Sequence, residues 1–447
     1  MADAIAASNL VKEELPNDHD KPETHLMLFI NGLNGNAGNW DVLIDQLGQY
    51  ASANEVAILV STANMSMKTY QGVDKCGERL AKEVSAYVEQ HPALQRISVL
   101  GHSMGGLIAR YALGKMYDPK TGLICGLRPA HFITLATPHL GCAGAVDSPA
   151  QVPLLQVAKI GGKPVQRVVA AAAKPFASMF LGSSGAQFFL HDSTDAQQPL
   201  LVRMTQDIPG DGYYFSAMKA FVTRTTYANI RGDQMVGWAN SSLRLPKDLP
   251  DASNVKGKGV VMETPLEDAL HPSDRLPVKR DSAAGRGGAS ITASTGSASM
   301  PGSNSGGALG FMPASPLEGG SGTRHMSSGS LTAVDKAEKS TEPKTQPPPA
   351  SVSQTGELPQ EIKEEEEEFE GSEATMEMLQ TLQKLPWRRI DADFSATSMP
   401  FFAHNLIQVT RKWLNWEGVA SVQHIAALIE EMEEDPRVQH ALAAKAK

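Results

Sequence analysis

The sequence predicts an α/β protein with a mainly parallel β-sheet flanked by helices. Short apolar runs alternate along the chain with segments whose apolar residues recur every three or four positions. Strands that alternate with helices in this way are typical of βαβ units, which build parallel sheets. The clearest unit is the stretch RISVLGHSMGGLIARYALG at residues 96–114, where an apolar run, a glycine-rich turn and a helical pattern follow one another.

The predicted elements of the first half of the chain place the core of the domain at residues 25–249, behind a polar leader at 1–24. Apolar runs indicate strands, at residues 26–30, 56–60, 97–100 and 131–136. Helical spacing indicates helices, at residues 40–47, at 74–89 and directly after Ser103. The sheet pattern resumes at residues 221–238 after an interruption.

Two insertions interrupt the domain. Residues 143–214 hold apolar helical segments, and we expect a helical cap there. Residues 250–373 are rich in glycine, serine, proline and glutamate and have too little apolar surface to bury, so we expect a long disordered loop. The folded pattern returns at residues 374–447, with a strand at 385–394 and a terminal helix after His404. We therefore expect one domain that a long loop divides near its end.

The composition excludes several kinds of partner and cofactor. The formal net charge is −9 and no basic stripe is evident, so we expect no nucleic-acid partner. The cysteines form no Cys-x-x-Cys pair, so we expect neither a metal site nor a disulfide framework, and no cofactor. A reducing, cytoplasmic compartment is the simplest expectation for such cysteine usage. These cysteines are Cys76, Cys125 and Cys142.

The sequence also shows no signal for export or membrane insertion. Residues 1–24 are polar and acidic, unlike a secretory signal or an organellar transit peptide. No apolar run reaches the ~20 residues that a membrane-spanning helix needs. We therefore expect any contact with membranes or lipid droplets to be peripheral, and no oligomeric state is indicated.

The turn GHSMG at residues 101–105 is a Gly-x-Ser-x-Gly motif between a predicted strand and a predicted helix. A serine hydroxyl is a poor nucleophile unless a histidine accepts its proton and an acid orients that histidine. Glycines on either side permit the strained bend that holds one serine at its tip. Ser103 is therefore the candidate nucleophile, with an ordinary glycine turn as the alternative. We interpret His102 as a packing residue, because adjacent side chains on such a turn point apart.

The acid and the base are expected later in the chain, each on a loop after a strand. Asp233 follows the strand-like TYANI at a Gly-Asp turn and is the candidate acid. A turn-capping role is the alternative for Asp233, and Asp207 and Asp211 are the alternative acids. His404 lies in a loop after the last predicted strand and is the candidate base.

Backbone N–H groups must also hold the oxyanion that forms during acyl transfer. Met104 follows the nucleophile directly, so its N–H is one candidate donor. The second donor is expected after an early strand, and Leu33 in FINGLNG occupies that position. A glycine turn that enters a helix is the alternative interpretation of this loop.

Several of these segments together resemble the lipase-like serine esterases of eukaryotic cells. They are GERLAKEVSAYV, ISVLGHSMGGLIARYALG, FITLATPHLG, YANIRGDQMVGW and AHNLIQV. The resemblance implies an α/β-hydrolase fold and a lipase or carboxylesterase activity on acyl esters of lipid-like substrates. It also supports Ser103, Asp233 and His404 in the roles assigned above. Such lipases usually carry His-Gly after the first core strand, whereas this chain has Asn31-Gly32.

Other functions remain compatible with these motifs. A thioesterase or a peptidase can use the same triad, because the triad is common to acyl transfers. An interaction or scaffold protein on a retained hydrolase fold is the alternative without catalysis. The complete order of serine, aspartate and histidine favours an enzyme.

Overall fold

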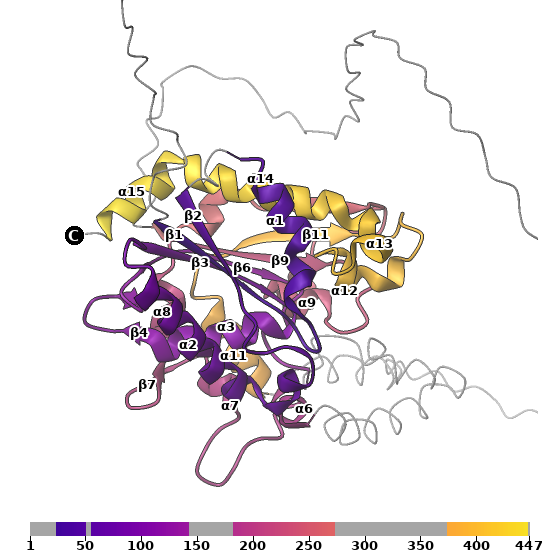
Figure 1. Ribbon diagram of the computed structural model, residues 1–447. Helices are drawn as coiled ribbons and strands as arrows, with labels where there is room; N and C mark the ends of the chain where they lie inside the picture. Colours follow the sequence, from indigo (N-terminus) through magenta and orange to yellow (C-terminus); the bar gives the residue numbers. More distant parts are fainter. Residues whose placement is uncertain (1–23, 51–54, 143–181, 273–372, 446–447) are drawn as a thin grey trace, which may run out of the picture. The chain divides into compact units, whose positions relative to one another are not determined.

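The described residues of the computed structural model, 24–50, 55–142, 182–272 and 373–445, form helices around one central sheet (Figure 1). The sheet has seven strands in the order β10-β11-β9-β6-β3-β1-β2. Six strands run parallel, namely β1 (His25–Ile30), β2 (Val56–Val60), β3 (Arg96–His102), β6 (Arg128–Leu135), β9 (Thr223–Asn229) and β11 (Arg388–Asp393). Only the edge strand β10 (Gly259–Glu263) pairs antiparallel within this sheet. The predicted α/β class and mainly parallel sheet are therefore confirmed.

Helices cover both faces of the sheet (Figure 1). One face is covered by α1 (Asp41–Leu47), α14 (Val419–Glu434) and α15 (Pro436–Ala444). The other face is covered by α2 (Val73–Gln90), α3 (Met104–Met116), α8 (Tyr214–Ala220) and α11 (Glu373–Leu382). Each of the two layers encloses its own hydrophobic core, because side chains of successive strand residues point to opposite faces.

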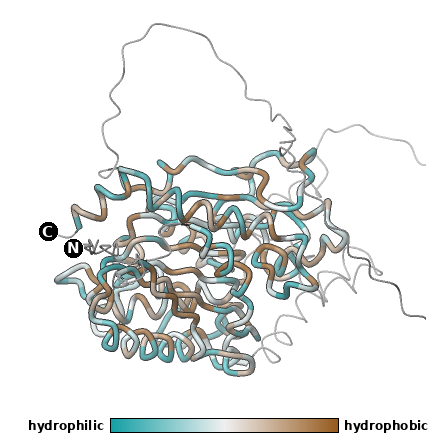
Figure 2. The backbone as a smooth tube through the Cα atoms, turned by 45° about the horizontal axis from the view of Figure 1, so that its top comes forward, coloured by the Kyte–Doolittle hydropathy of each residue, from teal (hydrophilic) through white to brown (hydrophobic). Residues whose placement is uncertain are grey.

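Strand β1 shows how one strand contributes to both cores. Leu26, Leu28 and Ile30 belong to the core under α2 and α3, whereas Met27 and Phe29 belong to the core under α1 and α14. A strand that is buried on both faces has a nearly continuous run of apolar residues in the sequence. Figure 2 shows hydrophobic residues concentrated in the central strands.

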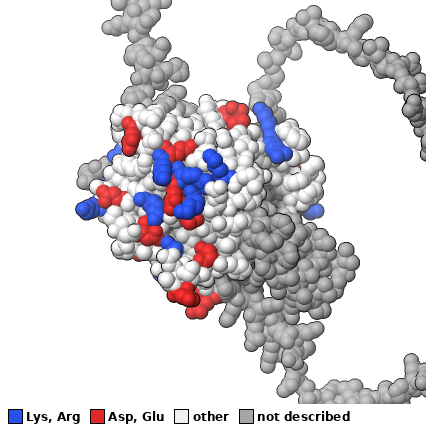
Figure 3. Space-filling view, turned by 60° about the horizontal axis from the view of Figure 1, so that its bottom comes forward, with Lys and Arg blue, Asp and Glu red and all other residues white. Residues whose placement is uncertain are grey.

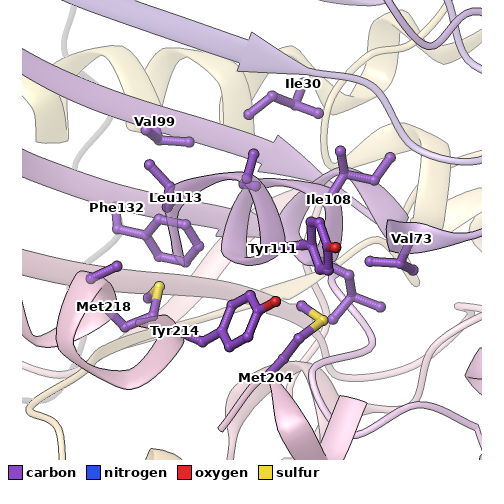
Figure 4. Close-up of a cluster of buried hydrophobic side chains, with 14 of the residues drawn as sticks. Ile30, Val73, Val99, Ile108, Tyr111, Leu113, Phe132, Met204, Tyr214 and Met218 are labelled. Carbon is purple, nitrogen blue, oxygen red and sulfur yellow. The ribbon is translucent and has the colours of Figure 1, made fainter. Parts of the chain in front are cut away.

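Aromatic side chains fill the core beneath α3. In Figure 4, Tyr111 of α3 lies near Tyr214 of α8, and their ring centroids are 5.6 Å apart. Phe132 of β6 packs against Phe221 with a centroid separation of 5.5 Å. Full burial of one such large side chain contributes about 1.5–3 kcal/mol. The first contact joins α3 to α8, and the second joins the end of α8 to β6. Helix α3 is the helix that begins after Ser103.

The outer surface of this helical layer carries charges of both signs. Figure 3 brings forward the face at the bottom of Figure 1, where Lys and Arg are interspersed with Asp and Glu. Two ion pairs of this layer share one carboxylate, because Asp211 lies 2.6 Å from Lys115 and 2.7 Å from Arg203.

The C-terminal segment contributes a strand to the central sheet. The strand expected at 385–394 is present as β11, and it lies between β9 and β10. The single helix expected after His404 is wrong, because two short helices, α12 (Ala403–Leu406) and α13 (Lys412–Asn415), occupy this segment. The chain cannot stay helical between them, since Val409 has a φ of 55° and Arg411 is extended. The long terminal helices α14 and α15 follow.

The structure describes only parts of the two predicted insertions. We expected disorder from residue 250, but β10 pairs with β11, and Leu266 is buried after it. Residues 182–214 hold short elements, among them α6 (Gly182–Phe188), α7 (Leu200–Arg203) and the hairpin of β7 (Asp207–Ile208) and β8 (Gly212–Tyr213). Residues 1–23, 143–181 and 273–372 lie outside the described residues, and so do most of the predicted leader, cap and loop. Among the helices of the described ranges, none has the length and apolarity needed to cross a membrane.

Candidate active site

Ser103 lies at the sharp turn between β3 and α3. Its backbone has φ 54° and ψ −128°, a conformation that costs of order 1–3 kcal/mol for a residue with a side chain. The Ser103 N–H donates to the carbonyl of Leu135 at 2.8 Å, which ties the turn to β6. A Cβ at Gly105 would lie 2.2 Å from the carbonyl oxygen of Ile30, so only glycine permits this close approach. The turn is therefore held under strain with Ser103 at its tip, 8% exposed.

The loop after β1 lies directly against this turn. A Cβ built on Gly32 would lie 2.7 Å from the Ser103 Cβ and 3.3 Å from its Oγ. Within the described residues, neither the Leu33 N–H nor the Met104 N–H has a hydrogen-bond acceptor. Met104 is the first residue of α3, where helical N–H groups lack intrahelical partners and carry partial positive charge. Two unpaired backbone donors therefore lie beside the Ser103 turn.

Asn31 stands at the position where the resembled lipases usually carry histidine. Its side chain is buried, and its Nδ2 donates weakly to the carbonyl of Ser61 at 3.5 Å. This contact ties the end of β1 to the end of β2, so Asn31 braces the loop that precedes Leu33.

Asp233 and His404 are hydrogen-bonded although 171 positions separate them in the sequence. Asp233 Oδ2 lies 2.9 Å from His404 Nδ1 and also accepts from Asn229 at 2.8 Å. Its other oxygen accepts the N–H groups of Met235 and Val236, at 2.8 and 2.9 Å. Burial alone would raise the pKa of Asp233, but the interaction with His404 and the other donors outweigh this effect and hold the pKa below its usual value. The carboxylate is therefore ionised, and His404 Nδ1 is the donor of their bond.

His102 joins His404 to the Ser103 turn. Its Nε2 lies 2.8 Å from the His404 carbonyl oxygen, and the two ring centroids are 4.8 Å apart. Burial lowers the pKa of His102 to about 3, so the ring is neutral and its Nε2–H donates to the carbonyl. The sequence predicted a packing role, and it gave no sign of this hydrogen bond. His102 directly precedes Ser103 in the sequence. The bond therefore holds the backbone of His404 close to the Ser103 turn.

The predicted residues thus come together from three loops that follow β3, β9 and β11. Within the described part of the chain, no hydrogen bond joins the Ser103 hydroxyl to His404. Such contacts between nucleophile and base are often long without substrate and tighten when it binds. No group of three His, Cys, Asp or Glu side chains in the described ranges is arranged to hold a metal.

The alternative acids are engaged elsewhere. Asp207 accepts the N–H and the hydroxyl of Ser216, and Asp211 pairs with Lys115 and Arg203. Both lie on the β7–β8 hairpin, and neither is hydrogen-bonded to His404. Of the three aspartates considered, only Asp233 contacts the candidate base.

The sequence comparisons identify relatives of this chain. The family described as "Putative serine esterase (DUF676)" matches residues 20–243, half of the chain. "Putative lipase C4A8.10" of Schizosaccharomyces pombe is 25% identical over 264 residues, which cover 57% of this chain and 30% of that protein. "Putative lipase ROG1" of Saccharomyces cerevisiae is 26% identical over 222 residues, which cover 49% of this chain and 28% of that protein. The matched regions therefore span less than a third of either relative's own length.

Solved structures with lower sequence identity are also similar. The mature form of lipase BlEst2 from Bacillus licheniformis is 15% identical, with a TM-score of 0.30 over 51% of this chain and 81% of that one. Phospholipase PlaB from Legionella pneumophila is 16% identical, with a TM-score of 0.28 over 49% of this chain and 41% of that one. On the family match over residues 20–243, the chain belongs to the "Putative serine esterase (DUF676)" family.

Proposed function

We propose that the protein is a serine hydrolase that cleaves acyl ester bonds of lipid-like substrates through Ser103, His404 and Asp233. The observation that carries this proposal is the 2.9 Å bond between Asp233 and a histidine whose backbone is tied to the residue before Ser103. A buried, ionised aspartate that orients a histidine beside a strained serine is the arrangement that activates a hydroxyl. Family membership and relatives named as lipases support a lipid ester as the substrate.

The proposed reaction begins when Ser103 Oγ attacks the ester carbonyl and passes its proton to His404 Nε2. Asp233 stabilises the imidazolium that forms, because its carboxylate accepts the Nδ1–H. The N–H groups of Leu33 and Met104 bind the oxyanion of the tetrahedral intermediate. When this intermediate collapses, the ester C–O bond breaks and His404 donates its proton to the leaving alcohol. Water then hydrolyses the acyl-enzyme at Ser103 by the same sequence of proton transfers.

A fluorophosphonate probe tests the activated nucleophile directly. We expect the probe to label the wild-type protein at Ser103, as determined by peptide mass spectrometry, and to leave Ser103→Ala unlabelled. Ser103→Ala should also lose ester hydrolysis and keep its circular dichroism spectrum, since the side chain contributes little to packing. No labelling of the wild-type protein would favour the scaffold function instead.

The substrate class is tested with matched acyl donors. The protein is assayed with esters and thioesters of the same acyl chains, graded in length. It should hydrolyse the esters faster than the thioesters, and the rate should depend on the length of the acyl chain. Faster turnover of the thioesters would assign the protein as a thioesterase, with the same triad at work.

A further inference from the structure

Large apolar side chains are exposed at one edge of the sheet. Among the described residues, eight such side chains are exposed, namely Ile58, Met65, Met67, Met235, Met399, Phe401, Trp413 and Trp416. All except Ile58 lie in segments that follow the carboxyl ends of β2, β9 and β11. Carboxyl ends of parallel strands meet at the same edge, so these seven side chains belong to one side of the protein. We call these seven residues the apolar rim.

Hydrogen bonds link the segments of the apolar rim to one another. The Ser66 N–H, between Met65 and Met67, donates to the Gly35 carbonyl at 3.0 Å. Farther along that loop, Asn39 Nδ2 donates to the Thr410 carbonyl at 2.9 Å. The rim segments after β2 and β11 are therefore joined through the loop after β1.

The remaining rim residues are attached to the same unit. The Ser398 N–H donates to Glu417 at 2.8 Å, which closes the segment that carries Met399, Phe401, Trp413 and Trp416. A Cβ at Gly232 would lie 2.1 Å from the Pro400 carbonyl oxygen, so the Asp233 turn packs against this segment.

The apolar rim adjoins the candidate active site. Met235 donates its N–H to Asp233, and Phe401 precedes His404 by three residues. Scattered exposed apolar residues need no explanation, but their concentration beside one site marks an interaction surface.

The chemistry of the apolar rim fits the surface of a phospholipid bilayer. Trp413 and Trp416 are 75% and 63% exposed, and tryptophan suits the boundary between headgroups and acyl chains. Arg411 and Lys412 precede Trp413, and Lys68 follows Met67; all three are exposed. Within the described residues, none of these three cations forms an ion pair, so they remain available for lipid phosphates.

We propose that the apolar rim docks on a phospholipid bilayer and thereby holds the Ser103 site against the surface that carries its substrate. The inference rests on the proposed function only for the nature of that substrate, since docking requires no turnover. An ester molecule can then reach Ser103 from the bilayer without passing through bulk water.

Vesicle binding tests this docking without hydrolysis of the vesicles. Ser103→Ala protein is mixed with phosphatidylcholine vesicles, with and without phosphatidylserine, and the bound fraction is measured by flotation. Adding Trp413→Ala and Trp416→Ala should weaken vesicle binding at least about tenfold, because each substitution removes apolar surface that the bilayer would otherwise bury. Ile58→Ala is the matched control, because Ile58 is exposed on β2 outside the rim, and it should bind as before.

Two further measurements test the role of the cations and the insertion of the tryptophans into the bilayer. Arg411→Gln with Lys412→Gln should weaken binding to phosphatidylserine vesicles, by about fivefold per charge, more than binding to phosphatidylcholine alone. Brominated lipids should quench the fluorescence of Trp413 and Trp416 more than that of Trp40 and Trp387, which are buried in the cores, or of Trp238, which is half-buried. Unchanged binding after loss of both charges would overturn the role of these cations.

Three outcomes would overturn the docking proposal. One is unchanged vesicle binding by the double tryptophan variant. Another is shielding of Trp413 and Trp416 from iodide before vesicles are added, which would mean that another part of the chain covers the rim. The third is a dimer in sedimentation that the double variant abolishes, which would assign the rim to a second copy.

Hydrolysis of a soluble short-chain ester by protein with Ser103 intact separates this inference from the proposed function. Vesicle binding without any hydrolysis would leave docking in place and reject the esterase. Hydrolysis without vesicle binding would retain the esterase and reject docking.

Discussion

At the scale of single residues, the proposed chemistry depends on the buried carboxylate of Asp233. Four donors surround its two oxygens, and they keep it ionised in spite of its burial. Its position could be predicted from the sequence, because it follows a strand and falls between the serine and the histidine in chain order. The hydrogen bond from His102 to His404 could not, because 302 positions separate the two residues and only the folded sheet brings them together.

Substitution of Asp233 tests the acid. Asp233→Asn should preserve the fold and lower kcat by ~10⁴-fold, as in serine proteases, because the amide cannot stabilise the imidazolium and favours the wrong histidine tautomer. Asp211→Asn is the control, since Asp211 pairs with Lys115 and Arg203 instead. Initial rates on one short-chain ester compare the variants, and circular dichroism checks their folding. A greater loss in Asp211→Asn than in Asp233→Asn would show that the acid has been misassigned.

His102 is expected to position His404 rather than to take part in proton transfer. His102→Ala removes the donor to the His404 carbonyl, and one such bond contributes about 1 kcal/mol, so kcat should fall several-fold with little change in KM. His102→Gln retains an N–H donor and should recover part of that loss. A drop in thermal stability with kcat unchanged would instead assign His102 to packing alone.

Among the elements, helix α14 is anchored at its C-terminal end by one buried carboxylate. Glu433 is 2.7 Å from Arg96 and 3.1 Å from His131 Nε2. Burial would raise the pKa of Glu433, but the His131 hydrogen bond and the neighbouring charges lower it to about 2. His25 also lies 3.3 Å away, although burial lowers its pKa to about 3 and leaves it neutral. This network joins the terminal helix to the amino ends of β1, β3 and β6.

Removal of that carboxylate should destabilise the protein. Glu433→Gln leaves the Arg96 guanidinium without its opposite charge, and breaking a buried ion pair costs about 3–5 kcal/mol. The adjacent, exposed Glu434 supplies the control, because Glu434→Gln should change the free energy of unfolding by less than about 0.5 kcal/mol. Urea denaturation measures both variants, and equal midpoints for the two would contradict the anchoring role.

The Glu433 network also predicts a pH dependence of stability. The pKa of Glu433 is lower in the folded protein than its ordinary value of 4.5, so its contribution is fully present above that value. It is lost as the pH falls from about 4.5 toward 2. The difference in unfolding free energy between wild type and Glu433→Gln should therefore shrink across this range, and a difference that stays constant would contradict the assignment.

Sequence periodicity predicted the parallel strands better than it predicted the break after His404 or the edge strand β10. Strands that are buried on both faces have continuous runs of apolar residues in the sequence. Most residues of β10 are only half-buried, and the segment around this strand is polar in composition. The break at Val409 depends on a backbone conformation that the apolar spacing of NLIQVTRKWLNWEG does not reveal.

At the scale of the whole molecule, the chain builds one sheet from two segments that are distant in sequence. The alternation of strands and helices predicted the α/β class, because each βαβ unit has a local signal. The strand order did not follow from the sequence, since β11 takes its place between β9 and β10 through pairing across the sheet.

The connection between β10 and β11 provides the last prediction. The two strands are neighbours in the sheet, with Val260 opposite Ala392, so their pairing does not depend on the length of the chain that joins them. Deletion of residues 283–344 should therefore leave the melting temperature nearly unchanged. The glycine- and serine-rich composition predicts few contacts there, and a shorter connection lowers the closure cost by only roughly 0.6 kcal/mol per halving. Differential scanning calorimetry gives the comparison, with hydrolysis of a short-chain ester as the check on the site. A large drop in melting temperature, or loss of soluble protein, would mean that the deleted residues contribute contacts that hold β10 and β11 in the sheet.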